Sequence, residues 1–179
     1  REAEQVESAR VVGVDVVEFL GFPDGVLEYG LPLRAAIAHA VRRHRPEIVI
    51  TGNFRDTFGG RNLNQADHIA TGRAVLDGVR DAGNRWIFND QLVDGLEPWG
   101  GVREVWANSS PNSEHGVDTT ATFAAGVASL EAHRAYIDGL GWEGWDPEEF
   151  LQGTSRGAGQ RMVVPFAAAF DVFPTGRAY

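Results

Sequence analysis

The stretch TGNFRDTFGGRNLNQADHIATG, residues 51–72, predicts a strand end that runs into a polar loop and then into a helix. An apolar run at residues 48–50 precedes it and is typical of a buried strand. The loop contains a Gly pair and several Asn residues, and the helix begins near Asp67 and His68. In open α/β sheets the carboxyl ends of strands and the amino ends of helices meet at the ligand site. We therefore expect any functional site to lie in this stretch.

The composition excludes several classes of protein. The net charge of −9 argues against a nucleic-acid surface, because phosphate binding needs a clustered positive field. All 16 basic residues are Arg, so the sequence has no lysine for a phosphate loop or a Schiff base. It also has no Cys, so any metal must be held by His and carboxylate side chains.

No segment of the sequence resembles a membrane span or a signal peptide. The longest apolar run, residues 162–170, contains Pro165 and is too short to cross a bilayer. We expect a cytoplasmic protein. The sequence opens without Met and already in a helical pattern, which we interpret as a processed or truncated start.

Helical and strand patterns alternate along the chain. Helices are expected over residues 1–12, 32–44 and 66–82, from 118 or 119 to about 137, and briefly from 147. Strands are expected over residues 14–20, 47–51, 85–89, 102–108 and 162–173. This alternation predicts a single Rossmann-like α/β domain whose sheet is mostly parallel and has helices on both faces.

Few residues could carry chemistry. Of five His residues, only His68 stands beside a carboxylate, Asp67, at the entry to a helix. The pair could be a metal ligand with its orienting group, a base with its support, or simply an acid that favours the helix dipole. Asp24 lies in a turn that could bind a ligand or cap its own backbone. His115 lies in a predicted loop, where it could contact substrate or merely be exposed.

One common enzyme motif, the H-E-x-x-H of the zincins, is absent from the sequence. A zincin therefore loses its usual sequence support.

Several segments, in order, resemble the LmbE-like or PIG-L deacetylases, metal-dependent enzymes that remove acetyl groups from N-acetylglucosaminyl substrates. The opening RxxExxxxAxxxGV is similar to a family helix, and EFLGFPDGVL at residues 18–27 is similar to the family's FLGxPDGxL loop. PEIVIT is similar to the strand before the second family motif. QADHIATG at residues 65–72 stands where the family has HPDHxAxG. VDTTATFAAGVASLEAHRAY is similar to a late family helix, so the resemblance covers residues 1 to about 137 and, more weakly, residues 166–176.

The resemblance implies roles for individual residues. It makes His68 a ligand of the metal, usually zinc, and Asp67 the adjacent catalytic carboxylate. Asp24 is expected to bind sugar hydroxyls. Gln65 replaces a His that stabilises the oxyanion; it can donate a hydrogen bond but cannot transfer a proton. Asn64 could share this contact with the substrate.

Two other family positions differ as well. Gly126 and Ala135 replace the usual Lys and Ser of the late helix.

The first family motif, Ala-His-Pro-Asp-Asp-Glu, does not occur in the sequence. In the family it supplies two metal ligands and the aspartate that activates water. We therefore expect residues 1–179 to be a single deacetylase-like domain without its first strand and metal motif. The missing part could have been removed, or could be a separate N-terminal segment.

The sequence thus predicts a zinc-dependent hydrolase that removes the acetyl group from an N-acetylglucosamine-type substrate. Its expected partners are that small amino sugar and either a second copy of the chain or a separate N-terminal segment. One alternative is a catalytically inactive sugar-binding α/β protein, favoured by Gln65 and the absent motif. A nucleotide-binding protein is a weaker alternative, because no phosphate loop is present.

Overall fold

The computed structural model describes residues 1–176 and divides into two compact units. Unit 1 comprises Arg1–Phe19 and Gly116–Ala168, and unit 2 comprises Leu20–His115 and the segment from Ala169. Every residue that the sequence singles out for a site belongs to unit 2. The prediction of a single domain without its first strand stays a prediction.

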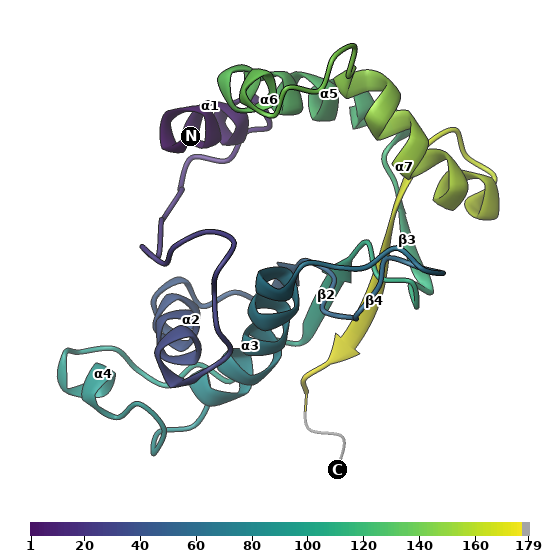
Figure 1. Cartoon of the computed structure of the whole chain (residues 1–179). Coiled ribbons are helices and arrows are strands. Elements are labelled where there is room, and N and C mark those ends of the chain that lie inside the picture. The colour runs from purple at the N-terminus through teal and green to yellow at the C-terminus, as the bar shows by residue number, and fades with distance from the viewer. Residues whose placement is uncertain (177–179) are drawn as a thin grey trace. The chain divides into compact units, whose positions relative to one another are not determined.

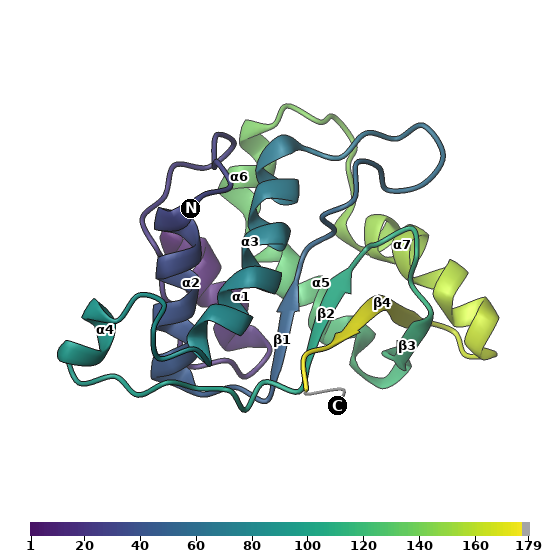
Figure 2. The ribbon, with the colours of Figure 1, turned by 90° about the horizontal axis from the view of Figure 1, so that it is seen from below.

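Unit 2 is built on a pair of adjacent helices that pack beside a strand. Helices α2 (Leu31–His44) and α3 (Ala66–Ala82) lie side by side near β1 (Ile48–Thr51), as Figure 2 shows. All three elements confirm their sequence predictions. The helices approach closely at Gly78, where a Cβ atom would lie 2.7 Å from Cγ2 of Ile37. The Arg34 guanidinium donates two hydrogen bonds of 2.9 Å to the Asp81 carboxylate, which ties α2 to the last turn of α3.

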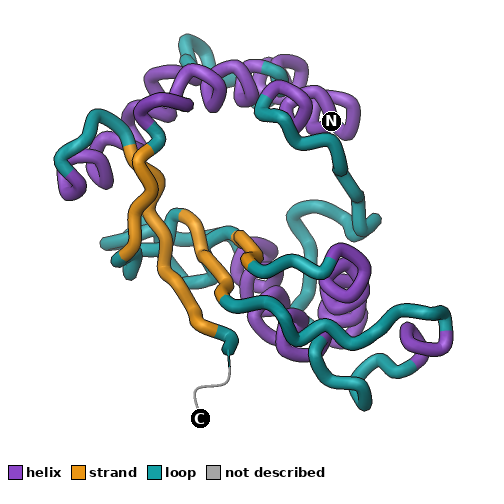
Figure 3. The backbone as a smooth tube through the Cα atoms, turned by 180° about the vertical axis from the view of Figure 1, so that it is seen from behind, coloured by secondary structure: helices purple, strands orange, loops and turns teal. Residues whose placement is uncertain are grey.

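The four strands form one sheet in the order β1-β2-β4-β3, and all four are labelled in Figure 2. Figure 1 labels β2, β3 and β4 from another side, and Figure 3 shows the strands in orange from behind. Strand β1 pairs in parallel with β2 (Glu104–Asn108), whereas β2 pairs antiparallel with β4 (Ala167–Pro174). The remaining strand is β3 (His115–Asp118), in a region where the sequence predicts a loop. The predicted α/β class is confirmed, and the sheet is mixed.

The two faces of the sheet differ in unit 2. Val49, Val105 and Phe173 are in register across β1, β2 and β4, and all three pack in the core with α2 and α3. Because strand side chains alternate between faces, Ile48 and Ile50 point the other way. They are 41% and 62% exposed.

The strand predicted at residues 85–89 is wrong. That segment forms turns and leads into the short helix α4 (Asp90–Val93). The cause is Arg42, which is 2% exposed and draws carbonyl groups of this segment around its guanidinium. Its acceptors are the carbonyl oxygens of Asp81, Ala82, Asn84, Ile87 and Phe88 and the side-chain Oε1 of Gln91. A chain that wraps around one cation cannot stay extended.

The strand predicted at residues 14–20 is also wrong, since the structure assigns it no regular secondary structure. Its β-branched and aromatic composition suits a strand, but a strand forms only where it pairs with a neighbour. The apolar side chains of Val14, Val16, Phe19 and Leu20 are between 47% and 64% exposed.

Unit 1 is mainly helical. Helix α1 (Glu2–Val11) confirms the first predicted helix. The single helix predicted to about residue 137 is instead divided into a 3-10 turn η1 (Thr120–Thr122), α5 (Phe123–Glu131) and α6 (Arg134–Gly139).

The C-terminal predictions need two further corrections. Helix α7 (Pro147–Met162) is longer than predicted and begins where Asp146 Oδ1 accepts the Glu149 N–H at 2.7 Å. It occupies the start of the strand predicted from residue 162, so β4 begins only at residue 167. Within residues 1–176, no helix has the length and apolar character needed to cross a bilayer.

Candidate functional site

The loop between β1 and α3 is held together by two asparagines. Asn53 is 3% exposed; its Nδ2 donates to the Thr57 carbonyl, and its Oδ1 accepts the Arg55 N–H, both at 2.9 Å. Asn64 Nδ2 donates to the carbonyls of Asn53 at 2.7 Å and Arg55 at 3.0 Å. These bonds fold the loop back on itself, so both of its ends are fixed next to the first turn of α3.

Helix α3 packs directly against the beginning of this loop at Gly72. A Cβ atom at Gly72 would lie 2.8 Å from Cβ of Phe54 and 3.0 Å from the carbonyl oxygen of Gly52. Real Cβ atoms do not approach other atoms this closely, so only glycine permits the observed packing. The Gly that ends the QADHIATG segment therefore brings the helix and the loop together.

A second loop reaches the start of α3 from residues 21–30. The backbone N–H of Gly25 donates to Oδ2 of Asp67 at 3.0 Å, and the Tyr29 hydroxyl donates to Oδ2 of Asp77 at 2.7 Å. Gly25 has φ of +81°, a conformation that favours glycine. The structure thus joins the two segments that resemble family motifs, 18–27 and 65–72.

The predicted site residues differ in availability. Gln65 is the N-cap of α3 and His68 lies in its first turn, and both are exposed. Asp24 is exposed and directly precedes Gly25. The amino end of α3 carries unpaired N–H groups and a partial positive charge, which favour a polar or anionic ligand beside these residues.

The other predicted residues are less open to a ligand. Asp67 is 6% exposed and already holds Gly25. Both polar atoms of the Asn64 side chain are used within the loop, because its Oδ1 also accepts the Gln65 N–H at 2.9 Å. His115 is exposed at the start of β3, which the sheet order separates from β1 by two strands.

The described residues do not form a complete metal site. Among residues 1–176, no three His, Asp or Glu side chains gather where a metal ion could bind them together. A catalytic zinc site uses three protein ligands and an open position. His68 supplies one imidazole, and the adjacent Asp67 carboxylate is bonded to a backbone N–H. The donor set of the described residues therefore does not by itself fit zinc.

Sequence reasoning missed a charged cluster behind the loop. Arg55 Nη2 lies 2.9 Å from Oδ2 of Asp171 on β4, and the Ser110 hydroxyl donates to the same oxygen at 3.1 Å. The one available signal was the acid at position 171 in an otherwise apolar strand. The sequence does not reveal which cationic side chain pairs with this acid.

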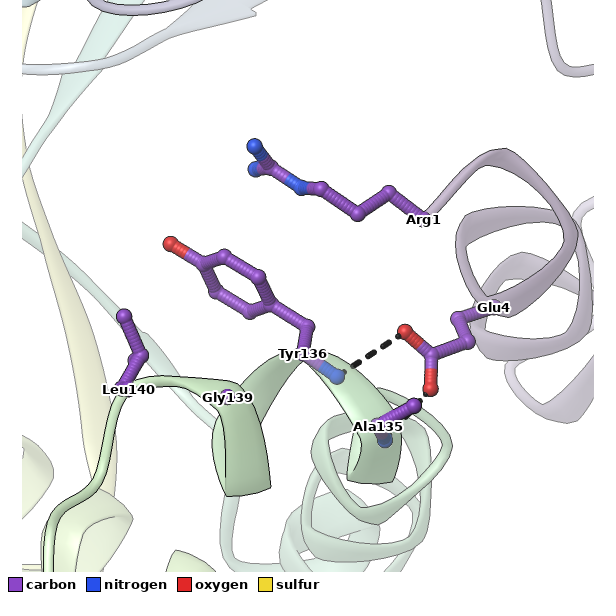
Figure 4. A pocket seen from close by; sticks show the side chains of 6 residues that line it. All are labelled: Arg1, Glu4, Ala135, Tyr136, Gly139 and Leu140. Carbon is purple, nitrogen blue, oxygen red and sulfur yellow. Dashed lines mark hydrogen bonds between the residues drawn. The ribbon is translucent and has the colours of Figure 1, made fainter.

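Two pockets elsewhere in the described residues contain none of the predicted site residues. One, of about 360 Å³ in unit 1, is drawn in Figure 4, where Glu4 accepts the N–H groups of Ala135 and Tyr136 at 2.7 and 3.3 Å. The Arg1 guanidinium lies over the Tyr136 ring, 4.3 Å from its centre. The other, of about 470 Å³, lies at the carboxyl end of α3.

Comparisons with known proteins identify relatives. Residues 1–79 match the family model described as PIG-L: GlcNAc-PI de-N-acetylase. Over 147 residues the chain is 25% identical to diacetylchitobiose deacetylase of Thermococcus kodakarensis, a match that covers 82% of this chain and 53% of that protein. The chain therefore spans about half the length of this curated relative.

Solved structures agree on the fold. N,N'-diacetylchitobiose deacetylase from Pyrococcus horikoshii, solved with its inhibitor MPG, has a TM-score of 0.86 at 23% identity, over 97% of this chain and 63% of that one. A conserved protein of Thermus thermophilus has a TM-score of 0.72 at 27% identity, over 94% of this chain and 70% of that one.

A third solved structure shares the fold with a different printed activity. GalB, a 4-carboxy-2-hydroxymuconate hydratase of Pseudomonas putida, has a TM-score of 0.71 at 16% identity, over 99% of this chain and 72% of that one. The fold alone therefore does not determine the reaction. Residues 1–79 are thus similar to the PIG-L family model, and most of the chain is similar to diacetylchitobiose deacetylase.

Proposed function

We propose that this chain forms the substrate-facing part of a metal-dependent hydrolase that removes the acetyl group from an N-acetylglucosamine-type sugar. The observation that carries the proposal is the bond from Gly25 to Asp67, which holds the Asp24 loop against the helix start with Gln65 and His68. The curated relative acts on diacetylchitobiose by its name. A short acetylated amino sugar is therefore the first substrate to test.

The exposed side chains suit parts of this task. Asp24 would accept hydrogen bonds from sugar hydroxyls, and the Gln65 amide would donate to the oxyanion that forms when the acetamide carbonyl is attacked. Gln65 cannot transfer a proton, so another group must do so. His68 would be one ligand of the metal. The other ligands must come from beyond the described residues, and we assign no reaction step to a metal held by this chain alone.

The experiment compares the 179-residue chain with the product of the complete open reading frame. Release of acetate from N,N'-diacetylchitobiose is measured for both proteins and for His68→Ala, and zinc binding is measured by calorimetry. We expect the 179-residue chain to bind zinc weakly. In whichever of the two proteins releases acetate, His68→Ala should abolish that activity. Tight stoichiometric zinc binding by this chain would contradict the incomplete donor set, and an active His68→Ala protein would contradict the ligand role.

A second candidate is a sugar-binding protein without catalysis. The burial of Asp67 and its bond to Gly25 favour it, because a carboxylate used in this way is not free to act as a base. Binding of diacetylchitobiose without acetate release, in the complete product with zinc supplied, would support this candidate over the hydrolase.

A further inference from the structure

One row of residues crosses the sheet where β1 and β2 end. Thr51 of β1 pairs with Ala107 of β2, and Ala107 pairs with Asp171 of β4. Side chains in register on neighbouring strands share a face, so the Asp171 carboxylate lies on the same face as Thr51. The Asp171 side chain is only 14% exposed. A carboxylate in this setting needs hydrogen-bond donors.

The main donor comes from the site loop. Arg55 follows Thr51 by four residues, and its Nη2 reaches Oδ2 of Asp171 at 2.9 Å. Its guanidinium also lies over the rings of Phe54 and Phe173, 4.9 and 5.8 Å from their centres. Arg55 therefore spans from the loop to β4, and its apolar stacking partners belong to both.

The backbone of Arg55 is joined to the helix start. Its carbonyl accepts from Asn64 Nδ2 at 3.0 Å, and the Asn64 Oδ1 accepts the Gln65 N–H at 2.9 Å. Asp171, Arg55, Asn64 and Gln65 thus form a continuous chain of contacts from β4 to the N-cap of α3. If Arg55 moved, its bond to Asn64 would move Asn64, and Asn64 would in turn move Gln65.

We propose that Arg55 is a positioning residue, which fixes the loop against β4 and so sets where Gln65 and the first turn of α3 lie. The inference rests on the proposed function only in taking Gln65 and His68 as the site. The described ion pair uses a single nitrogen, Nη2, while Nε is buried without a hydrogen-bond partner. A lysine ammonium can keep this point contact with Asp171 but cannot stack on Phe54 and Phe173 as the guanidinium does, so it should replace part of the function.

The test is residue-resolved amide hydrogen exchange on the 179-residue chain, which needs no activity. Reporters are the Phe58 and Asn64 amides, which bond to Asn62 and Asp56 carbonyls at 2.8 and 2.9 Å within the loop. Amides in the middle of α3 serve as the internal reference. Arg55→Met should speed exchange of both reporters by about tenfold, the loss expected for one charge-assisted bond, without affecting the reference.

Two matched variants complete the test. Ser110→Ala removes a donor from the same Asp171 oxygen but leaves the loop attached, so the reporters should keep their wild-type rates. Arg55→Lys keeps the ion pair without the stacking, so it should restore part of the protection lost in Arg55→Met. A uniform acceleration that includes α3, no acceleration at the reporters, or a Lys variant as fast as the Met variant would overturn the proposal. Acetate release does not enter this result, so a failed deacetylase assay would leave the positioning role standing.

Discussion

The backbone N–H of Gly25 donates to Oδ2 of Asp67 at 3.0 Å, across 42 positions of sequence. The carboxylate is 6% exposed, so the bond forms largely out of water and draws additional strength from the negative charge. Because Gly25 directly follows Asp24, this contact attaches the backbone beside Asp24 to the first turn of α3. Asp67 is thus the anchor of the site, whatever further role its charge has.

Replacing Asp67 by Asn removes the negative charge of the side chain but keeps an oxygen that can bind the Gly25 N–H. The Asn Oδ1 can still accept the Gly25 N–H, whereas Ala leaves that N–H without its partner. We expect the Gly25 amide to keep most of its hydrogen-exchange protection in Asp67→Asn and to lose it in Asp67→Ala. The Ala variant should also be less stable by about 1.5–3 kcal/mol in urea unfolding. Equal protection in the two variants would show that the hydrogen bond does not hold the loop.

Gly72→Ala and Gly153→Ala form a matched pair of substitutions, because both glycines lie within helices. Gly72→Ala should destabilise the chain by about 1–3 kcal/mol, because its Cβ meets Phe54 and the Gly52 carbonyl. Gly153→Ala in α7 meets nothing within 4 Å and should be stabilising by about 0.5–1 kcal/mol, since Ala is the better helix former. Urea unfolding measures both. If Gly72→Ala is as stable as Gly153→Ala, the close packing of α3 on the loop is wrong.

The sequence predicts the elements whose local pattern and tertiary surroundings agree. Helices α2 and α3 have apolar residues at helical spacing, and β1 is a short apolar run before a polar loop, so all three were predictable. The segment at residues 85–89 has the composition of a strand, but the buried Arg42 turns its carbonyls inward. A contact over more than 40 positions overrides local preference there.

The site was predictable to a different degree. Adjacent residues such as Gln65, Asp67 and His68 could be grouped, because they share a helix start. The bond between Asp67 and Gly25 could be found only from the fold, because the two residues are far apart in the sequence. The pairing of Arg55 with Asp171, 116 positions away, is set by strand register and loop folding, which periodicity does not encode.

Arg42 should be the most sensitive polar residue of the α2–α3 pair. Burial lowers the pKa of its guanidinium, which nevertheless remains charged because an arginine pKa lies far above neutrality. Arg42→Met leaves several carbonyls without a donor, including those that end α3, so we expect a loss of about 2–4 kcal/mol in urea unfolding. Arg73→Met, at an exposed position of α3, is the control and should change stability by less than about 0.5 kcal/mol. Similar losses in both variants would contradict the role of Arg42 in holding these carbonyl groups.

Tyr29 gives the attachment of residues 21–30 a defined dependence on pH. The pKa of Tyr29 lies above its ordinary value, mainly because its hydroxyl donates to Asp77, with smaller effects of burial and of the Asp77 charge. Since the folded-state pKa is raised, the contribution of this bond to stability is complete below about pH 10 and is lost as pH rises through the folded-state pKa. The stability difference between wild type and Tyr29→Phe, measured by urea unfolding at a series of pH values, should therefore shrink above about pH 10. A difference that stays constant or grows there would mean that the hydroxyl does not bond to Asp77.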